Sequence, residues 1–194
     1  RISLNAYTGL TSLTNKVAVL NTTQYPELLS DMGATTALPD NLTDQTDWYK
    51  ETFQTAMTQN YQLSVSNATD KLNYYVSAGY TGEEGIIKVA YFDRFNFRSN
   101  IENQIRPWLK IGANISYSDY TSNGIISGQG ANRAGVVLSV LNTPTYAPVM
   151  DPNNPTQYNT NFYGVNITSP VENMARSEDN KSRNNRLIST GSAE

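Results

Sequence analysis

The chain of 194 residues contains no cysteine and no histidine. Without cysteine it has neither a disulfide framework nor a thiolate metal site. Without histidine it lacks the Ser-His-Asp and Cys-His nucleophile systems, the commonest general base and the commonest zinc ligand. The sequence therefore predicts a protein that is not an enzyme, with no catalytic residues, no metal site and no cofactor.

The sequence also lacks any apolar run near the ~20 residues that a transmembrane helix requires. A membrane-spanning β-strand needs only about 9–11 residues, of which half are polar, so this absence leaves a β-barrel open. Only 16% of the residues are charged and the formal net charge is -3. That balance gives no basic surface for nucleic acid. Low charge with 13 tyrosines fits antiparallel sheet with polar loops better than disorder.

Apolar and polar residues alternate strictly through several segments between residues 59 and 121. A period of two indicates strands with one apolar face and one polar face. The polar positions are mostly Asn, Ser, Gly and Gln, which is typical of a transmembrane β-barrel wall between lipid and a polar lumen. The positions predicted to face lipid are Leu63, Val65, Tyr74, Val76, Phe95, Phe97, Ile111 and Ile115.

The polar positions Arg94, Asn96, Arg98 and Asn114 are predicted to face the lumen. An arginine at mid-bilayer depth on the lipid side would cost ~2–4 kcal/mol, which supports the lumen side for both arginines. The sequence allows two partners for these arginines: an anionic substrate, or acidic residues of a plug or of the barrel wall. The second alternative is favoured.

The lengths of the connections predict how the chain is organised. Short connections at 67–70 and 104–107 join strands at one end, and longer connections lie at the other. Barrels with short periplasmic turns and long extracellular loops sort their connections in this way. We therefore expect one fragment of a larger barrel domain, 1–194, divided into a first strand (1–9), a long outer loop (10–58), strands two to five (59–121), a second long outer loop (122–183) and the start of a sixth strand (184–194).

The predicted fold class is all-β: a partial antiparallel transmembrane β-barrel wall of about six strands, with two long extracellular loops that contain short helices. Helices are expected after the capping residues Thr23 and Asp47, and around 131–141. Six strands cannot close a barrel, so the chain is expected to be part of a longer protein.

Aromatic residues among Asn and Thr in the second long loop are candidate contacts for a ligand or a lid. Ring faces beside amide groups suit polar, partly apolar ligands such as glycans. Packing within the loop is the favoured use of each ring. The candidates are Tyr146, Tyr158, Phe162 and Tyr163.

Residues 47–121 resemble the first part of the barrel of SusC/RagA-type TonB-dependent transporters of the Bacteroidetes outer membrane. The opening Leu4–Gly9 and the stretch Leu20–Leu29 fit the same family. The segments that carry the resemblance are Asp47-Trp48, Asn60–Ser66, Lys71–Tyr80, Glu84–Lys88, Arg94–Asn100 and Trp108–Asn114.

The resemblance implies a plugged barrel of about 22 strands in the bacterial outer membrane. It implies import of oligosaccharides or peptides, a SusD-like surface lipoprotein over the mouth, and contact with the TonB complex through regions absent from this chain. Outer-membrane lipid and a glycan or peptide ligand are then the other partners. The alternative is a soluble secreted carbohydrate-binding β-sandwich, whose apolar faces would meet in a core.

Overall fold

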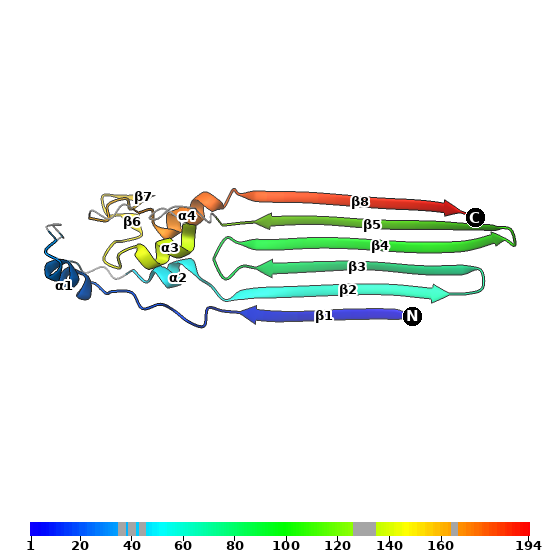
Figure 1. Ribbon diagram of the computed structural model, residues 1–194, viewed down its shortest axis with the longest axis horizontal. Helices are drawn as coiled ribbons and strands as arrows, with labels where there is room; N and C mark the ends of the chain where they lie inside the picture. The colour runs from blue at the N-terminus through cyan, green and yellow to red at the C-terminus, as the bar shows by residue number, and fades with distance from the viewer. Residues whose placement is uncertain (35–37, 39–41, 43–45, 126–134, 164–166) are drawn as a thin grey trace.

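The computed structural model describes residues 1–34, 38, 42, 46–125, 135–163 and 167–194. Its main element is a six-stranded antiparallel sheet in the order β1-β2-β3-β4-β5-β8, so each long strand pairs with the long strand before it (Figure 1). The all-β, antiparallel prediction is confirmed, and the sheet is not closed into a barrel. The strands are β1 (Ile2–Thr11), β2 (Ala56–Ala68), β3 (Leu72–Glu84), β4 (Tyr91–Arg106), β5 (Leu109–Asn123) and β8 (Lys181–Ala193).

The remaining elements gather at one end of the sheet, and both chain ends lie at the other (Figure 1). This loop cluster comprises the elements outside the six-stranded sheet, together with the segments that join them. Across the described ranges, no helix has the length and apolar character needed to cross a membrane. The elements are α1 (Gln24–Asp31), α2 (Trp48–Thr52), α3 (Gly135–Asn142), α4 (Pro170–Ser177) and the small hairpin β6 (Met150–Asp151) and β7 (Asn154–Tyr158).

Local chemistry explains the tight turn between β2 and β3. The backbone N–H of Thr69 donates to the carbonyl oxygen of Leu72 over 2.9 Å, and the Thr69 hydroxyl accepts from the Leu72 N–H, also over 2.9 Å. A Thr side chain that bonds its own turn is a common device at such positions. The β4–β5 turn contains Pro107, which lies between the strands where no ladder donor is needed.

The helix caps differ in part from the predictions. Asp47 caps α2 as expected, because its carboxylate accepts from the N–H of Lys50 over 3.1 Å. The Thr23 side chain makes no cap, so that prediction is wrong. The side chain of Asn21 accepts instead from the N–H groups of Thr23 and Gln24, over 3.0 and 2.8 Å. A carboxamide one turn earlier reaches both free N–H groups at this helix start.

Helix α4 was not predicted, although its signals are present. Ser169 accepts from the Glu172 N–H over 3.1 Å, and Pro170 occupies the first helical turn. Serine followed by proline and an early Glu is a strong helix start. In α3, the described residues begin at Gly135, so the part of the 131–141 prediction before it lies outside the described residues.

Apart from Ala56 at the start of β2, the buried hydrophobic side chains lie in the loops at the end of the sheet rather than between layers of sheet. One cluster surrounds Trp48, and a second joins Ile87, Val136 and Met174. The described fold therefore has its core above the end of the sheet. The sheet itself presents two open faces.

Candidate functional site: a two-faced sheet below a packed loop cluster

The strand register sorts the side chains of the sheet into two faces. Directly opposed residues of antiparallel strands project to the same side. One row across all six strands is therefore apolar or small, and it comprises Leu4, Leu63, Ala78, Phe97, Tyr117 and Leu187.

All the side chains predicted to face lipid share this apolar face. Val65 lies opposite Val76, Tyr74 opposite Ile101 and Ser99 opposite Ile115. Phe95 and Ile111 follow at steps of two along the same strands. The register brings these residues together on one face, and their contact with lipid stays a prediction.

The apolar face is open and long. Leu63 is 48% exposed, Phe95 45% and Leu187 66%. On β4 it runs without charge from Phe95 to Ile105, which at ~3.3 Å per residue is about 33 Å. A strand tilted by ~40° would carry that length across an apolar band about 25 Å tall.

Charge on the apolar face begins at its loop end. Asp119 of β5 forms an ion pair with Arg183 of β8 at 2.7 Å. Tyr80 donates its phenol O–H to Asp93, also over 2.7 Å. These groups mark the place where the uncharged stretch gives way to a polar rim, as at the edge of a membrane-spanning band.

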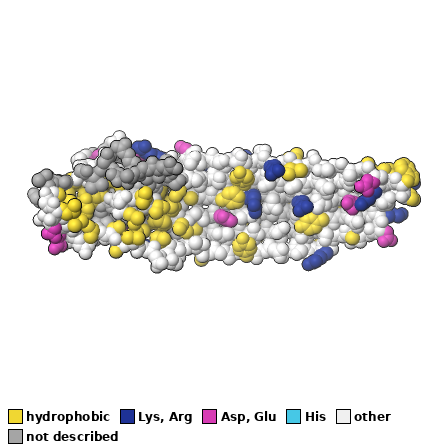
Figure 2. Space-filling model, in the orientation of Figure 1, with side chains coloured by type: hydrophobic (Ala, Val, Ile, Leu, Met, Phe, Trp, Pro, Cys, Tyr) yellow, Lys and Arg dark blue, Asp and Glu magenta, His cyan; other side chains and the backbone are white. Residues whose placement is uncertain are grey.

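The opposite, polar face carries the residues predicted to line a lumen. Arg94 lies opposite Tyr120, Arg98 opposite Ser116 and Asn100 opposite Asn114. Figure 2 shows a face of the sheet that is mostly neither hydrophobic nor charged, with basic and hydrophobic side chains scattered across it. The lumen assignment stays a prediction.

Arg186 belongs to the same polar face and was not predicted. It lies opposite Ser118 of β5, which lies opposite Asn96 of β4. Its place could have been predicted from the alternation of the last segment, because its neighbours Asn185 and Leu187 belong to the apolar face.

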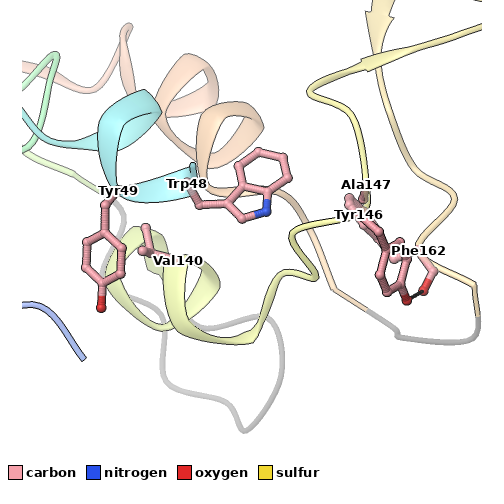
Figure 3. Close-up of a cluster of buried hydrophobic side chains, with 6 residues drawn as sticks. All are labelled: Trp48, Tyr49, Val140, Tyr146, Ala147 and Phe162. Atoms are coloured by element: carbon pink, nitrogen blue, oxygen red, sulfur yellow. Dashed lines mark hydrogen bonds between the residues drawn. The ribbon is translucent and has the colours of Figure 1, made fainter. Parts of the chain in front are cut away.

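Above the sheet, hydrogen bonds join the two long loops. The hydroxyl of Thr46 donates to the carbonyl oxygen of Ala147 over 2.8 Å. The hydroxyl of Thr145 donates to the carbonyl of Leu20 over 2.9 Å. Buried side chains from both loops meet beside these bonds, as Figure 3 shows for Trp48 and its neighbours.

The short connection between β3 and β4 is part of the same unit. The N–H of Lys88 donates to the carbonyl oxygen of Thr52 over 3.0 Å, and the N–H of Gln54 donates to Ile86 over 2.9 Å. The side-chain amide of Asn123 donates to the carbonyl of Val89 over 2.7 Å. Three connections far apart in the sequence thus form one packed body.

The four aromatic candidates divide by burial. Tyr146 and Phe162 are each 2% exposed, and the Tyr146 hydroxyl donates to the Phe162 carbonyl over 3.4 Å. Tyr158 and Tyr163 are partly exposed. Tyr146 and Phe162 pack among the loop side chains in this structure, and their contact with a ligand or lid stays a prediction. Contact through Tyr158 and Tyr163 stays a prediction.

Burial raises the pKa of Tyr146 above that of an ordinary phenol, and the nearby Tyr25 and Tyr163 raise it further. The ring centres of these neighbours lie 5.2 and 5.6 Å from that of Tyr146. An apolar environment disfavours the charged phenolate. Tyr146 is therefore favoured in its neutral, protonated form within the loop cluster.

The part of the chain that the structure describes contains no group of three or more acidic side chains placed to hold a metal ion. Its geometry offers two open faces and a compact loop body.

Comparison with known proteins gives the same picture. The chain is 27% identical to TonB-dependent receptor P26 of Formosa agariphila over 143 residues, which are 73% of this chain and 13% of that protein. It is 26% identical over 169 residues to TonB-dependent receptor SusC of Bacteroides thetaiotaomicron, covering 87% of this chain and 16% of that protein. No protein-family model matches.

The fold is similar to that of the RagAB peptide importer in its open-open state, with a TM-score of 0.72 and 22% identity. The chain is thus similar in sequence to a segment of TonB-dependent receptors, SusC among them, and similar in fold to a segment of the RagAB importer. It covers 25% of the matched importer chain and 13–16% of the two receptors. These SusC/RagA-type relatives are described as receptors and importers, not as enzymes.

Proposed function

We propose that the chain supplies part of the wall and outer loops of a TonB-dependent importer of large nutrients, oligosaccharides or peptides, in the bacterial outer membrane. The observation that carries the proposal is the sorting of the sheet into an apolar face, charged only at its loop end, and an Asn- and Arg-bearing polar face. Lipid on the first side and a wet lumen on the second would satisfy both faces.

The alternative, a soluble carbohydrate-binding β-sandwich, requires a second layer over the apolar face. In the described ranges, the only other sheet is the β6–β7 hairpin, which belongs to the loop cluster. Leu4 is 69% exposed and Leu63 48%. The importer accounts for this exposure because lipid would cover these side chains.

In this proposal the loop cluster lies at the extracellular mouth and contributes to capture of the ligand. A SusD-like surface lipoprotein is the proposed lid. The names of the relatives that support the proposal include both a SusC receptor and a peptide importer, so the nutrient class is proposed only as oligosaccharide or peptide. The TonB complex would act through other parts of the protein.

The test is the membrane behaviour of the gene product that contains this chain. Cells are fractionated, and outer-membrane protein is run on a gel with and without boiling. We expect a protein several times larger than 21.5 kDa, found in the outer membrane and shifted in mobility by heat. Recovery as a monomer in detergent-free buffer, with no heat shift, would contradict the proposal.

A further inference from the structure

We propose that Arg94, Arg98 and Arg186 together form a carboxylate-binding site on the polar face of the sheet. The inference rests on the proposed function, in which this face lines the lumen. The site would hold a carboxylate that is joined to an apolar or ring-shaped group.

The register brings the three arginines together. Arg186 lies in the row between the rows of Arg94 and Arg98, on β8 rather than β4. Strands are ~4.8 Å apart, so one intervening strand separates the backbones by about 10 Å. Arginine side chains are long enough to converge over the strand between them, which offers Ser118 in the row of Arg186, Ser116 in the row of Arg98 and Tyr120 in the row of Arg94.

The three guanidinium groups lack a carboxylate within the described ranges. The ion pairs there are Lys110–Glu102, Arg176–Glu172 and Arg183–Asp119. Lys110 and Glu102 are on the same polar face, 3.0 Å apart, nearer the turns. Nearer the loops, Arg94, Arg98 and Arg186 form no ion pair in the described ranges, and neither does Glu83, which lies opposite Phe92 on the same face. An added carboxylate would offset the repulsion among the three arginines.

Two adjoining hollows open beside the arginines. One, of about 820 Å³, is lined by Arg94 and Arg186 among others. The other, of about 350 Å³, is lined by Arg98, Asn100 and Asn114. They share Ser116 and Ile188, so they are neighbouring parts of one depression in the polar face.

An aromatic pair lies at the loop end of the same depression. The rings of Phe92 and Tyr120 are 5.7 Å apart, and both residues line the larger hollow. Arg94 is directly opposite Tyr120 in the register. A guanidinium fork can hold a carboxylate through two parallel hydrogen bonds, while a ring face holds an apolar or sugar group.

This chemistry fits two sources of the carboxylate. One is a transported ligand, such as a peptide with a free carboxyl terminus or an acidic sugar. The other is an acidic side chain elsewhere in the same protein that lies in the lumen. The recognised group is the same in both cases, and the experiment separates the sources.

The experiment measures how fast phenylglyoxal modifies individual arginines in the purified, full-length gene product, with mass spectrometry as the readout. Arg106, which is exposed at the β4–β5 turn, is the internal reference. The probes are a short peptide ending in phenylalanine as the free acid or the amide, and digalacturonate as the free acid or the methyl ester. The preparation is first checked for outer-membrane origin and heat shift.

A transported carboxylate predicts fast modification of the three arginines in the free protein. At least one free-acid probe should slow it fivefold or more, and its neutral counterpart should not. An internal carboxylate predicts slow modification without any probe and release by 1 M sodium chloride, since salt screens ion pairs. Fast modification that no probe slows, or slow modification that salt leaves unchanged, would overturn the site.

Variants give a second readout. Arg98→Gln combined with Arg186→Gln should weaken binding of the protective probe at least tenfold, or release Arg94 to phenylglyoxal if the carboxylate is internal. Arg183→Gln, on the opposite face of β8, is the matched control and should change neither the binding of the probe nor the modification of Arg94.

If the heat shift and outer-membrane location are absent, the proposed function fails. If they are present and the arginine rates do not follow either pattern, this inference alone fails.

Discussion

The indole N–H of Trp48 donates a hydrogen bond to the carbonyl oxygen of Pro144, 3.0 Å away and 96 residues further along the chain. Trp48 begins α2 in the first long loop, and Pro144 follows α3 in the second. The tryptophan is only 2% exposed. A buried hydrogen bond between two loops makes their conformations depend on each other.

Trp48→Phe keeps an aromatic ring but leaves the Pro144 carbonyl oxygen without its donor. An unsatisfied buried acceptor costs ~1–3 kcal/mol, so we expect the loop cluster to open at lower urea concentration. Limited proteolysis of the assembled protein at rising urea measures this opening. Trp108→Phe is the control, since Trp108 is 76% exposed at the β4–β5 turn. Equal protection in both variants would contradict the role of the indole.

Gly85→Ala should destabilise the short connection between β3 and β4. A Cβ at this position would lie 2.6 Å from the Cβ of Ala90 and 3.1 Å from its carbonyl oxygen. Overpacking of this kind costs ~1–3 kcal/mol. Proteolysis at rising urea reports the effect, with Gly9→Ala as the control because nothing lies within 4 Å of a Cβ there.

Ala90→Gly added to Gly85→Ala tests the mechanism. Removal of the opposing methyl group should restore part of the lost stability, since the closest contact disappears. No recovery in the double variant would indicate that the clash with Ala90 is not the cause.

Arginine scanning of neighbouring positions tests the two faces. Leu63→Arg should cost ~2–4 kcal/mol in the lipid-reconstituted protein, because it places a charge against mid-bilayer lipid. Ser64→Arg, one residue away on the polar face, should cost much less. Ile111→Arg and Asn114→Arg repeat the comparison on β5. Urea unfolding from liposomes gives the free energies, and equal tolerance at all four positions would refute the assignment.

The pH dependence of the loop cluster should follow Tyr146. Its folded-state pKa is raised by burial above the value of ~10 for a free phenol, so the folded state holds its proton more tightly. The resulting stability is complete below pH ~10 and falls as pH rises from there toward the folded-state pKa. Proteolysis between pH 8 and 11 measures the loss. Tyr146→Phe, which cannot ionise, should show a shallower dependence on pH.

The strands were predictable because their signal is local. Alternation of Leu63 with Ser64, and of Ile111 with Gly112, repeats over enough residues to fix which side chains share a face. A turn chemistry such as that of Thr69 then sets the register between neighbours. The expected sorting of long and short connections depends on the same local information.

The loop cluster was less predictable because its contacts are distant in sequence. Trp48 meets Pro144, and Thr145 meets Leu20 across 125 residues. The periodicity of the sequence does not indicate which distant residues pair, so the burial of Tyr146 and Phe162 could not be predicted. Two features that were not predicted could have been found in the sequence. Ser169-Pro170 marks the start of α4, and alternation along the last strand places Arg186 opposite Ser118.

The strand order has a consequence for how the wall is assembled. Every long strand pairs with the one synthesised before it, from β1 through β5 to β8. Each pairing in this sheet therefore joins consecutive long strands, and only the connection between them has to be closed. For this segment, no pairing encloses another strand of the sheet, so lengthening a connection changes the closure cost of one strand pair alone.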